Sequence, residues 1–372
     1  MNIKLNTLKA TNEVIKRLNN MRRWARNCAD PRYSELAKQA LNCAIAFILA
    51  SEAEARGMEI IWERFPKIAL YRAFQKSYIN YDTPESILKR ICELGNIKFE
   101  KVFSEITDKV ICELTDEEFI DFLKEGCGTN EEEIYKAATR IATLLELYEV
   151  QHHMNGEYAS KHEEVFRSFL RFVDIPGFED LCNIEADSFQ VFKSISRLRN
   201  QNRWSAYSYL VDCSVLGHLF DTAVFAYFMA LDKGKTEKVA TRCFFIGIFH
   251  DIPETFTSDI PSPIKDMIPG FRELTEKFEL QVMEEKFYPV FSKQVQQNLR
   301  KVMMEEEENH QYKTLMKGAD YLSAVSEIWR QIQAGTNDPA FFTAMKGHKT
   351  KFEKGIAELT PVTKDLFEWL YE

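Results

Sequence analysis

Residues 215–231 read VLGHLFDTAVFAYFMAL, a run that would be apolar on almost every side of a helix. A helix with this pattern is buried, because a surface helix keeps one polar face toward water. His218 interrupts the run, and a polar side chain in such surroundings needs a partner. The stretch therefore predicts a central core helix whose histidine is either a hydrogen-bonded core residue or a metal ligand.

Helical patterns continue along most of the chain. Further helices are predicted over Ser34–Ala55, Glu237–Phe249 and Lys313–Ala334. Pro253 should end the second of these just before it, and Ser262-Pro263 is a typical start for another helix. The chain has only 14 Gly and 11 Pro, whereas sandwiches and barrels need turn residues about every 8–12 positions. With no convincing alternating strand, we predict an all-α fold.

Length and charge narrow the class of protein. A chain of 372 residues with 45% hydrophobic residues fits a two-domain protein. Its net charge is −9, and Lys and Arg are scattered among acids instead of forming a basic stripe. This argues against a nucleic acid polymer or an anionic membrane as the main partner. A small anionic substrate is compatible, since one or two Arg residues suffice to bind a phosphate.

The N-terminus and the cysteines indicate the compartment. The first residues, MNIKLNTLKATNEVIKRL, lack the apolar core of a signal peptide, and no apolar run reaches the ~20 residues of a membrane span. The eight Cys residues include no C-x-x-C pair, and most lie in apolar helical patterns. Buried thiols of this kind are typical of a reducing compartment. We therefore expect a cytoplasmic protein with no membrane partner.

The chain also repeats itself. We place a domain boundary at Pro176-Gly177, which separates residues 1–178 from residues 179–372. Without gaps, IKRLNNMRRW (residues 15–24) matches ISRLRNQNRW (residues 195–204) at an offset of 180 residues. Chance likeness of two amphipathic helices is the alternative explanation. A duplication predicts two tandem helical bundles.

Four residues of the second half have the chemistry of a metal site. His250-Asp251 ends one predicted buried helix, and His218 lies inside another. Asp320 stands beside Gly318-Ala319, where small residues allow close approach of a neighbour. Two imidazoles and two carboxylates form a mixed nitrogen and oxygen ligand set for a borderline divalent ion.

Taken together, these residues resemble the HD-domain 5′-deoxynucleotidases over residues 190–345. The resemblance rests on the stretch FHDIPETFTSDIPSPIK at residues 249–265, and on Arg203-Trp204, His218, His250-Asp251, Glu254, Asp259 and Asp320. One position departs from the family pattern, because Gly217 stands where a Glu usually precedes the first metal-binding His. A hydrogen-bond partner for His218 is then either absent or supplied from elsewhere in the chain.

For the metal site, the resemblance implies that four side chains hold one divalent ion. They are His218, His250, Asp251 and Asp320. The ion is Mn, Co, Zn, Mg, Fe or Ni, and its chemistry is to polarise a phosphoryl oxygen and to activate water.

The resemblance also implies catalytic and substrate-binding residues. Glu254 would orient or deprotonate the water, and Asp259 would protonate the leaving sugar oxygen or position the water. Arg203 would bind the substrate phosphate, and Trp204 would pack against a base or sugar, or support Arg203. Glu254 would equally suit a first helical turn, and Asp259 a cap or turn.

The implied activity is metal-dependent release of phosphate from a small phosphorylated substrate, in the first place a (deoxy)nucleoside 5′-monophosphate. Two alternatives stay open: hydrolysis of a nucleoside triphosphate or a phosphodiester at the same site, and a non-catalytic nucleotide-binding regulator. Glu254 and Asp259 are both present, which argues against the regulator.

The first half has no metal ligands at the matching positions. Lys38 stands opposite His218, Gln75-Lys76 opposite His250-Asp251, Thr139 opposite Asp320, and Ile79 opposite Glu254. Because two Lys residues there would repel a cation, we predict a degenerate HD-like bundle that binds no metal. HD nucleotidases of this type tend to dimerise, so a fused copy predicts either a monomer with an internal pseudo-two-fold pair or a homodimer.

The other histidines lie in polar or charged stretches or at a helix tail. We predict solvated surface positions for His152, His153, His162, His310 and His348. The run Glu305–Glu308 is predicted to be a solvated face as well.

Overall fold

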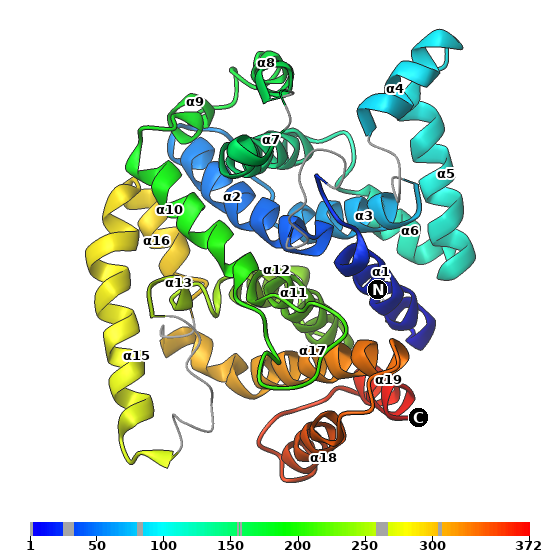
Figure 1. Ribbon diagram of the computed structural model, residues 1–372, viewed down its shortest axis with the longest axis vertical. Coiled ribbons are helices and arrows are strands. Elements are labelled where there is room, and N and C mark those ends of the chain that lie inside the picture. The colour runs from blue at the N-terminus through cyan, green and yellow to red at the C-terminus, as the bar shows by residue number, and fades with distance from the viewer. Residues whose placement is uncertain are drawn as a thin grey trace.

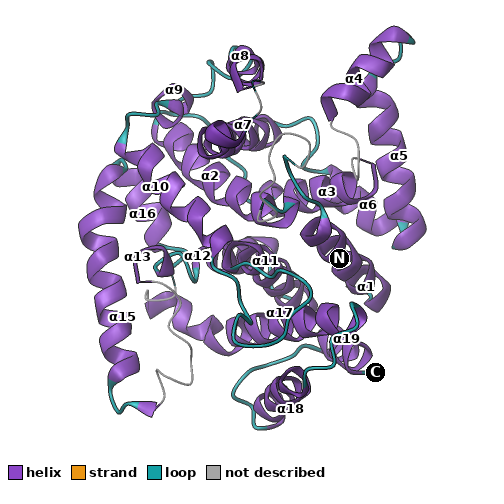
Figure 2. Ribbon diagram, in the orientation of Figure 1, coloured by secondary structure: helices purple, strands orange, loops and turns teal. Residues whose placement is uncertain are grey.

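Helices account for the regular secondary structure of the protein (Figure 2), which we describe from a computed structural model. The structure describes residues 3–24, 33–79, 85–154, 156, 158–257, 267–303 and 307–372. Within these ranges there is no strand, and β-pairing is limited to two isolated bridges. The predicted all-α fold is confirmed. Asp259, Ser262-Pro263 and the Ile79 side chain lie outside the described residues.

In chain order, the helices lie on either side of the predicted boundary, Pro176-Gly177. The first half contains α1 (Leu5–Asn20), α2 (Glu35–Ala55), α3 (Arg64–Ile79), α4 (Glu85–Leu94), α5 (Phe99–Leu114), α6 (Glu117–Lys124), α7 (Asn130–Val150), η1 (Gln151–His153) and α8 (Tyr158–Phe169). The second half contains α9 (Phe178–Cys182), α10 (Asp187–Ser196), η2 (Arg197–Asn200), α11 (Val215–Asp232), α12 (Glu237–Phe249), α13 (Glu254–Thr257), α15 (Phe271–Val282), η3 (Met283–Phe287), η4 (Tyr288–Val290), α16 (Lys293–Arg300), η5 (Glu307–Tyr312), α17 (Lys313–Gln333), α18 (Pro339–Glu353) and α19 (Pro361–Tyr371). The predicted helices are present as α2, α11, α12 and α17, and each end agrees to within one residue.

The helix α11 is the centre of the fold (Figure 1), where it packs against α12, α17 and α2. Every side chain from Val215 to Leu231 is buried, as the apolar pattern predicts. Ser214 starts the helix by accepting a hydrogen bond from the Gly217 amide at 3.0 Å, which satisfies one of the free amides of the first turn. Among the described helices, α11 alone is long and apolar enough to cross a membrane, but 94% of it is buried inside the protein.

Two glycines allow unusually close packing around this centre. A Cβ atom at Gly247 would lie 2.4 Å from the Cα atom of Ala223, so α12 rests directly on the backbone of α11. A Cβ atom at Gly318 would lie 1.8 Å from the carbonyl oxygen of Glu358. The second contact confirms the prediction that small residues beside Asp320 allow close approach. The first brings the end of α12 against the helix that carries His218.

The turns that precede α2 and α11 are built from the same backbone hydrogen bonds. Each turn has an isolated bridge two residues before its Trp, and each is closed by two amide–carbonyl bonds. In the first half these are Arg23 N to Tyr33 O at 2.6 Å and Glu35 N to Met21 O at 3.0 Å; in the second they are Arg203 N to Cys213 O at 2.7 Å and Val215 N to Gln201 O at 2.9 Å. The backbone hydrogen bonds of the two turns are therefore related by the same 180-residue offset as the sequence match.

The tryptophan of each turn is held in the same strained conformation. Trp24 and Trp204 have φ angles of 60° and 65°, in the left-handed region that costs a non-glycine residue roughly 1–3 kcal/mol. Each indole Nε1 donates to a buried glutamate, Trp24 to Glu146 at 3.1 Å and Trp204 to Glu327 at 2.7 Å. Such a conformation persists only where surrounding contacts enforce it, and these hydrogen bonds are among those contacts.

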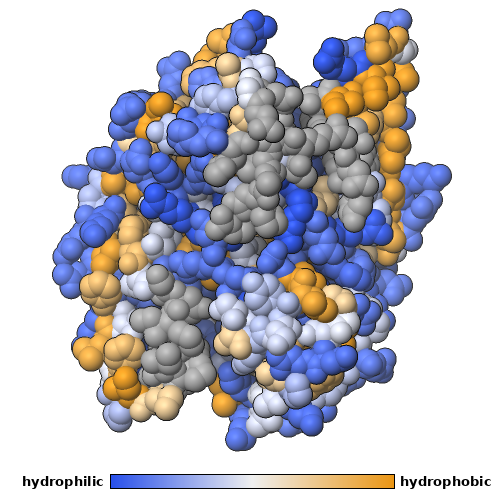
Figure 3. All heavy atoms as spheres, viewed as in Figure 1, coloured by the Kyte–Doolittle hydropathy of each residue, from blue (hydrophilic) through white to orange (hydrophobic). Residues whose placement is uncertain are grey.

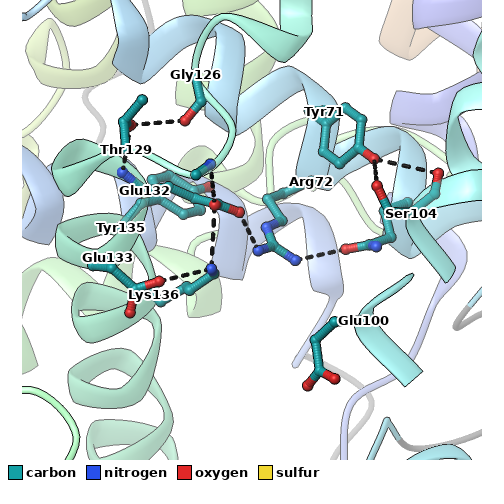
Figure 4. A network of polar contacts seen from close by, with 12 residues as sticks. Tyr71, Arg72, Glu100, Ser104, Gly126, Thr129, Glu132, Glu133, Tyr135 and Lys136 are labelled. Carbon is teal, nitrogen blue, oxygen red and sulfur yellow. Dashed lines mark hydrogen bonds and ion pairs between the residues drawn. The ribbon is translucent and has the colours of Figure 1, made fainter. Parts of the chain in front are cut away.

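Charged side chains tie α3 to α7 in the first half (Figure 4). Arg72 pairs with Glu132, which also accepts a hydrogen bond from the Gly128 amide at 2.9 Å. Arg72 donates to the side-chain oxygen of Gln75 at 2.7 Å as well. Gln75, predicted to stand opposite His250, is therefore engaged in a salt-bridge network that joins two helices.

The face of the molecule shown in Figure 3 is mostly hydrophilic, but apolar residues gather over α4 and α5. Ile91, Leu94 and Ile97 belong to this surface, and Leu94 is 87% exposed. The pair α4 and α5 stands at the edge of the molecule, away from α11 and α13 (Figure 1). This apolar surface thus takes no part in forming the His218 surroundings.

The close contact at Gly247 makes a specific prediction for stability. Gly247→Ala should lower the free energy of unfolding by about 1–3 kcal/mol, because the new methyl group meets backbone atoms that cannot move aside. Gly347→Ala is the control, since a Cβ there meets nothing within 4 Å, and it should stabilise by about 0.5–1 kcal/mol. Urea denaturation followed by circular dichroism measures both. Equal effects of the two substitutions would contradict the close packing of α12 on α11.

Candidate metal centre

His218 is buried, with 1% of its surface exposed, and it contacts three side chains of α17 as well as Thr222 of its own helix, whose Oγ1 atom lies 3.3 Å from His218 Nε2. Its Nε2 atom lies 3.0 Å from Asp320 Oδ1, while its Nδ1 atom lies 3.2 Å from Glu327 Oε1 and 2.9 Å from Ser323 Oγ. These three residues follow one another at positions 320, 323 and 327, and therefore share one face of the helix. The facing helices α11 and α17 thus set the orientation of the imidazole ring.

His250 and Asp251 directly follow the last residue of α12. His250 Nδ1 lies 2.8 Å from the carbonyl oxygen of Gly247. A carbonyl oxygen only accepts, so Nδ1 carries a proton, and in the neutral ring Nε2 presents its lone pair. That Nε2 atom is buried and has no hydrogen-bond partner among the described residues, although it lies 3.3 Å from Asp251 Oδ2. A buried nitrogen with an unused lone pair fits a metal ligand.

Three of the four predicted ligands form one cluster. Ligand atoms of His218, His250 and Asp251 all lie within 4.8 Å of one another. Asp320 joins the cluster through its 3.0 Å contact with His218 Nε2, and its side chain is 34% exposed. Imidazole nitrogens and carboxylate oxygens in this proportion suit a borderline divalent ion. The residues present therefore fit the predicted metal ion.

The charges around the cluster keep its carboxylates ionised. Burial by itself would raise the pKa of Asp320, but the hydrogen bond and the charge of His218 hold it well below its usual range. Burial likewise opposes ionisation of Glu327, yet Arg203 and His218 lower its pKa to about 2. Burial and Arg203 lower the pKa of His218, but Glu327 and Asp320 outweigh them and raise it to about 9. At neutral pH the carboxylates are thus ready to bind a cation, which must displace the proton of His218.

Glu327 connects the metal cluster to the predicted substrate-binding residues, and the sequence analysis missed it. Its carboxylate, 1% exposed, contacts His218 through Oε1 and accepts from Arg203 Nε at 3.1 Å and Trp204 Nε1 at 2.7 Å through Oε2. Its position seven residues after Asp320, on the same face of a predicted helix, was the available signal.

Gly217, where the sequence departs from the family pattern, lies against the first half of the chain. A Cβ atom there would lie 3.3 Å from Leu36 Cδ2 of α2, so this position faces the first half of the chain. The partner of His218 is supplied from elsewhere in the chain, by Glu327 of α17, which is one of the two possibilities that the sequence left open.

Arg203-Trp204 lies in the turn that precedes α11. The Trp204 ring packs against Tyr207 and Phe341, with ring centroids 5.8 and 5.7 Å away. Together with the bond to Glu327, these contacts show that Trp204 supports the turn. Its contact with a base or sugar stays a prediction. Arg203 is held at the edge of the centre by Glu327, and its side chain is 19% exposed.

Glu254 begins α13, a single turn that follows the metal cluster. It is 9% exposed, and its amide donates to the Asp251 carbonyl at 3.1 Å. Glu254 therefore follows Asp251, a predicted metal ligand, by one turn of the backbone. Asp259, the second predicted catalytic residue, lies outside the described residues.

The predicted surface histidines divide into two groups. His152 and His310 are exposed, as predicted, while the His153 side chain lies outside the described residues. For His162 and His348 the prediction of full solvation is wrong, because both are half-buried against aromatic rings. His348 packs on Tyr321 at a centroid distance of 5.0 Å, and burial lowers its pKa to about 4. Aromatic residues lie next to both histidines, and the charge pattern of the sequence did not indicate these contacts.

The role of Glu327 leads to a prediction about metal affinity. Glu327→Gln should weaken binding of Mn²⁺ by about 10–100-fold, because the partner that orients His218 loses its charge. Isothermal titration with Mn²⁺ gives the dissociation constant. Glu358→Gln serves as the control, since that carboxylate is exposed and pairs with Lys233, and it should leave the affinity unchanged. Equal affinities of both variants and the wild type would contradict the role of Glu327.

Comparison with known proteins places this centre in a family. Residues 190–366 match the family described as 5′-deoxynucleotidase YfbR-like. A 5′-deoxynucleotidase of Yersinia pestis (strain Pestoides F) is 29% identical over 169 residues, which cover 45% of this chain and 82% of that protein. A 5′-deoxynucleotidase of Yersinia pseudotuberculosis serotype O:3 (strain YPIII) is similar to the same extent. The predicted resemblance is thus confirmed, and residues 190–366 are an HD-type phosphohydrolase domain of the YfbR-like 5′-deoxynucleotidase family.

Proposed function

We propose that the protein releases phosphate from (deoxy)nucleoside 5′-monophosphates with one divalent metal ion held by His218, His250, Asp251 and Asp320. The observation that carries the proposal is the cluster of His218, His250 and Asp251 within 4.8 Å, in a domain of the 5′-deoxynucleotidase family. A divalent ion bound by these side chains would supply the Lewis acid that polarises the phosphoryl oxygen and activates water.

The residues around the cluster bind the phosphate, activate the water and protonate the leaving group. Arg203 binds the phosphate, because a guanidinium fork matches two phosphate oxygens and Glu327 holds it beside His218. Glu254, one turn after Asp251, orients or deprotonates the attacking water. Asp259 protonates the leaving sugar oxygen or positions the water, and Trp204 lines the sugar or base.

We further propose that residues 1–178 are a degenerate copy of the HD bundle in residues 179–372, and that its chemistry was replaced by fixed charges. Support comes from the matching turns before α2 and α11 and from the glutamates that hold Trp24 and Trp204. Lys38, opposite His218, donates to Thr143 at 2.6 Å and lies 3.9 Å from Glu146. Its ammonium thus occupies surroundings where the second half has an imidazole.

We also propose an oligomeric state, a partner and a cellular compartment for the protein. A fused copy gives each chain an internal pseudo-dimer, so the protein is a monomer, or a homodimer of such chains. Its partner is a small phosphorylated molecule, and its compartment is the cytoplasm.

A screen of substrates and metals tests the proposed activity. Purified protein loaded with Mn, Co, Zn, Mg, Fe or Ni should release phosphate from nucleoside 5′-monophosphates and bind one ion per chain. His250→Ala and Asp320→Ala should lose both the metal and the turnover, because each removes a ligand. Release from triphosphates or phosphodiesters alone would favour the alternative hydrolase. Full activity and one bound ion in either variant would show that the site assignment is wrong.

Kinetics separate the roles of Arg203 and Glu254. Arg203→Lys should mainly raise KM, since the charge stays while the two-pronged contact is lost. Glu254→Gln should mainly lower kcat, by about 100-fold or more if it is the general base, with metal content unchanged. Steady-state rates and elemental analysis measure these effects. The reverse pattern would refute the two assignments.

A further inference from the structure

The predicted substrate-binding turn is held at both ends by the first half of the chain. We call residues 197–214 the substrate segment, since they contain Arg203-Trp204 and lead into α11. Its middle is bound by its own half, where Gln331 accepts from the amides of Leu210 and Val211 at 2.8 and 3.0 Å. Its two ends also contact the first half of the chain, at α1, α7 and the turn before α2.

The start of the substrate segment is anchored by Arg199. This guanidinium lies 3.5 Å from Glu146 of α7, and both side chains are almost fully buried, at 2% and 1% exposure. The cation also lies over the Tyr33 ring, 4.6 Å from its centroid, while its Nε donates to the Ser196 carbonyl at 2.7 Å. A buried Arg needs such partners, because an unpaired charge is strongly disfavoured away from water.

Further contacts reinforce both ends of the substrate segment. Ser196, just before it, donates to Glu149 Oε1 at 2.6 Å. Near its far end, the Asp212 carbonyl accepts from Asn19 at 2.9 Å, and the Asp212 carboxylate pairs with Arg22 at 3.0 Å. The donors and acceptors from the first half are therefore spread over α1, the turn that follows it, and α7.

Glu146 is the residue where these contacts converge. It receives Arg23 and Trp24 of its own half, just as Glu327 receives Arg203 and Trp204 in the second half. Glu327 additionally binds His218, whereas Glu146 additionally binds Arg199 from the other half. The carboxylate that serves a metal ligand in one half thus serves the substrate segment in the other.

We infer that Glu146 and Arg199 are positioning residues for the reaction: the first half of the chain fixes the substrate segment, and so places Arg203 beside the His218 centre. This inference rests on the proposed function, because it takes Arg203 as the phosphate ligand. It assigns to residues 1–178 a task that needs no metal, namely to supply the buried anchor of a turn that belongs to the second half.

Arg199→Met tests the inference, and Arg199→Lys is the conservative variant. Hydrogen–deuterium exchange of peptides that cover residues 201–214 should be at least tenfold faster in Arg199→Met. With the metal-loaded protein, KM for each of the four deoxynucleoside 5′-monophosphates should rise at least fivefold, while kcat falls less than twofold. Arg199→Lys should recover most of both effects, because an ammonium group still pairs with Glu146 and packs on Tyr33.

Arg64→Met is the matched control. Arg64 also pairs with a glutamate of α7, Glu131, at 3.0 Å, but among the described residues its ion pair does not involve the substrate segment, so exchange at 201–214 and KM should stay at wild-type values. Unchanged exchange in Arg199→Met, or equal effects of Arg199→Met and Arg64→Met on KM and kcat, would overturn the inference. A wild type that releases no phosphate from nucleotides would refute the proposed function instead, and the exchange measurement would still decide whether Arg199 anchors the segment.

Discussion

The second half of the chain depends on the interactions that the buried carboxylate of Glu327 makes. One of its oxygens contacts His218, and the other accepts from Arg203 and Trp204. A carboxylate at 1% exposure is costly unless its lone pairs are satisfied, so the turn before α11 and the helix α17 must meet at this point. The same side chain sets the ring of a predicted metal ligand and the position of a predicted phosphate ligand, so it links the two parts of the candidate site.

The first half also has a buried carboxylate that needs compensating partners. Glu146 is as buried as Glu327, and its charge is balanced by Arg23, Lys38 and Arg199. Burial would raise its pKa, but these cations lower it to about 2, so the group stays ionised at neutral pH. Burial and Arg23 lower the pKa of Lys38 to about 7 despite its acidic neighbours. Arg23 and Arg199 therefore carry most of the positive charge that balances Glu146 at neutral pH.

Close backbone packing explains why the metal cluster can form. His250 lies at the end of α12, and it reaches His218 because Gly247 lets α12 rest on Ala223 of α11. The Gly247 carbonyl also binds His250 Nδ1 at 2.8 Å, so the residue that allows the approach also selects the tautomer. Any larger residue at this position would move the ligand nitrogen and its partner together.

The sequence by itself determined the helices and the core position of α11, because apolar periodicity is a local property, and residue chemistry singled out His218, His250, Asp251 and Asp320 as candidate metal ligands. It also contained the sequence match around Trp24 and Trp204 at an offset of 180 residues. Only the tertiary structure identified Glu327 and Glu146, and it placed Arg199 of one half against α7 of the other. Glu327 lies 123 positions along the chain from its partner Trp204, and Glu146 lies 53 positions from its partner Arg199. Their roles depend on which helix faces meet, and the pairing of buried charges is settled only when the chain packs.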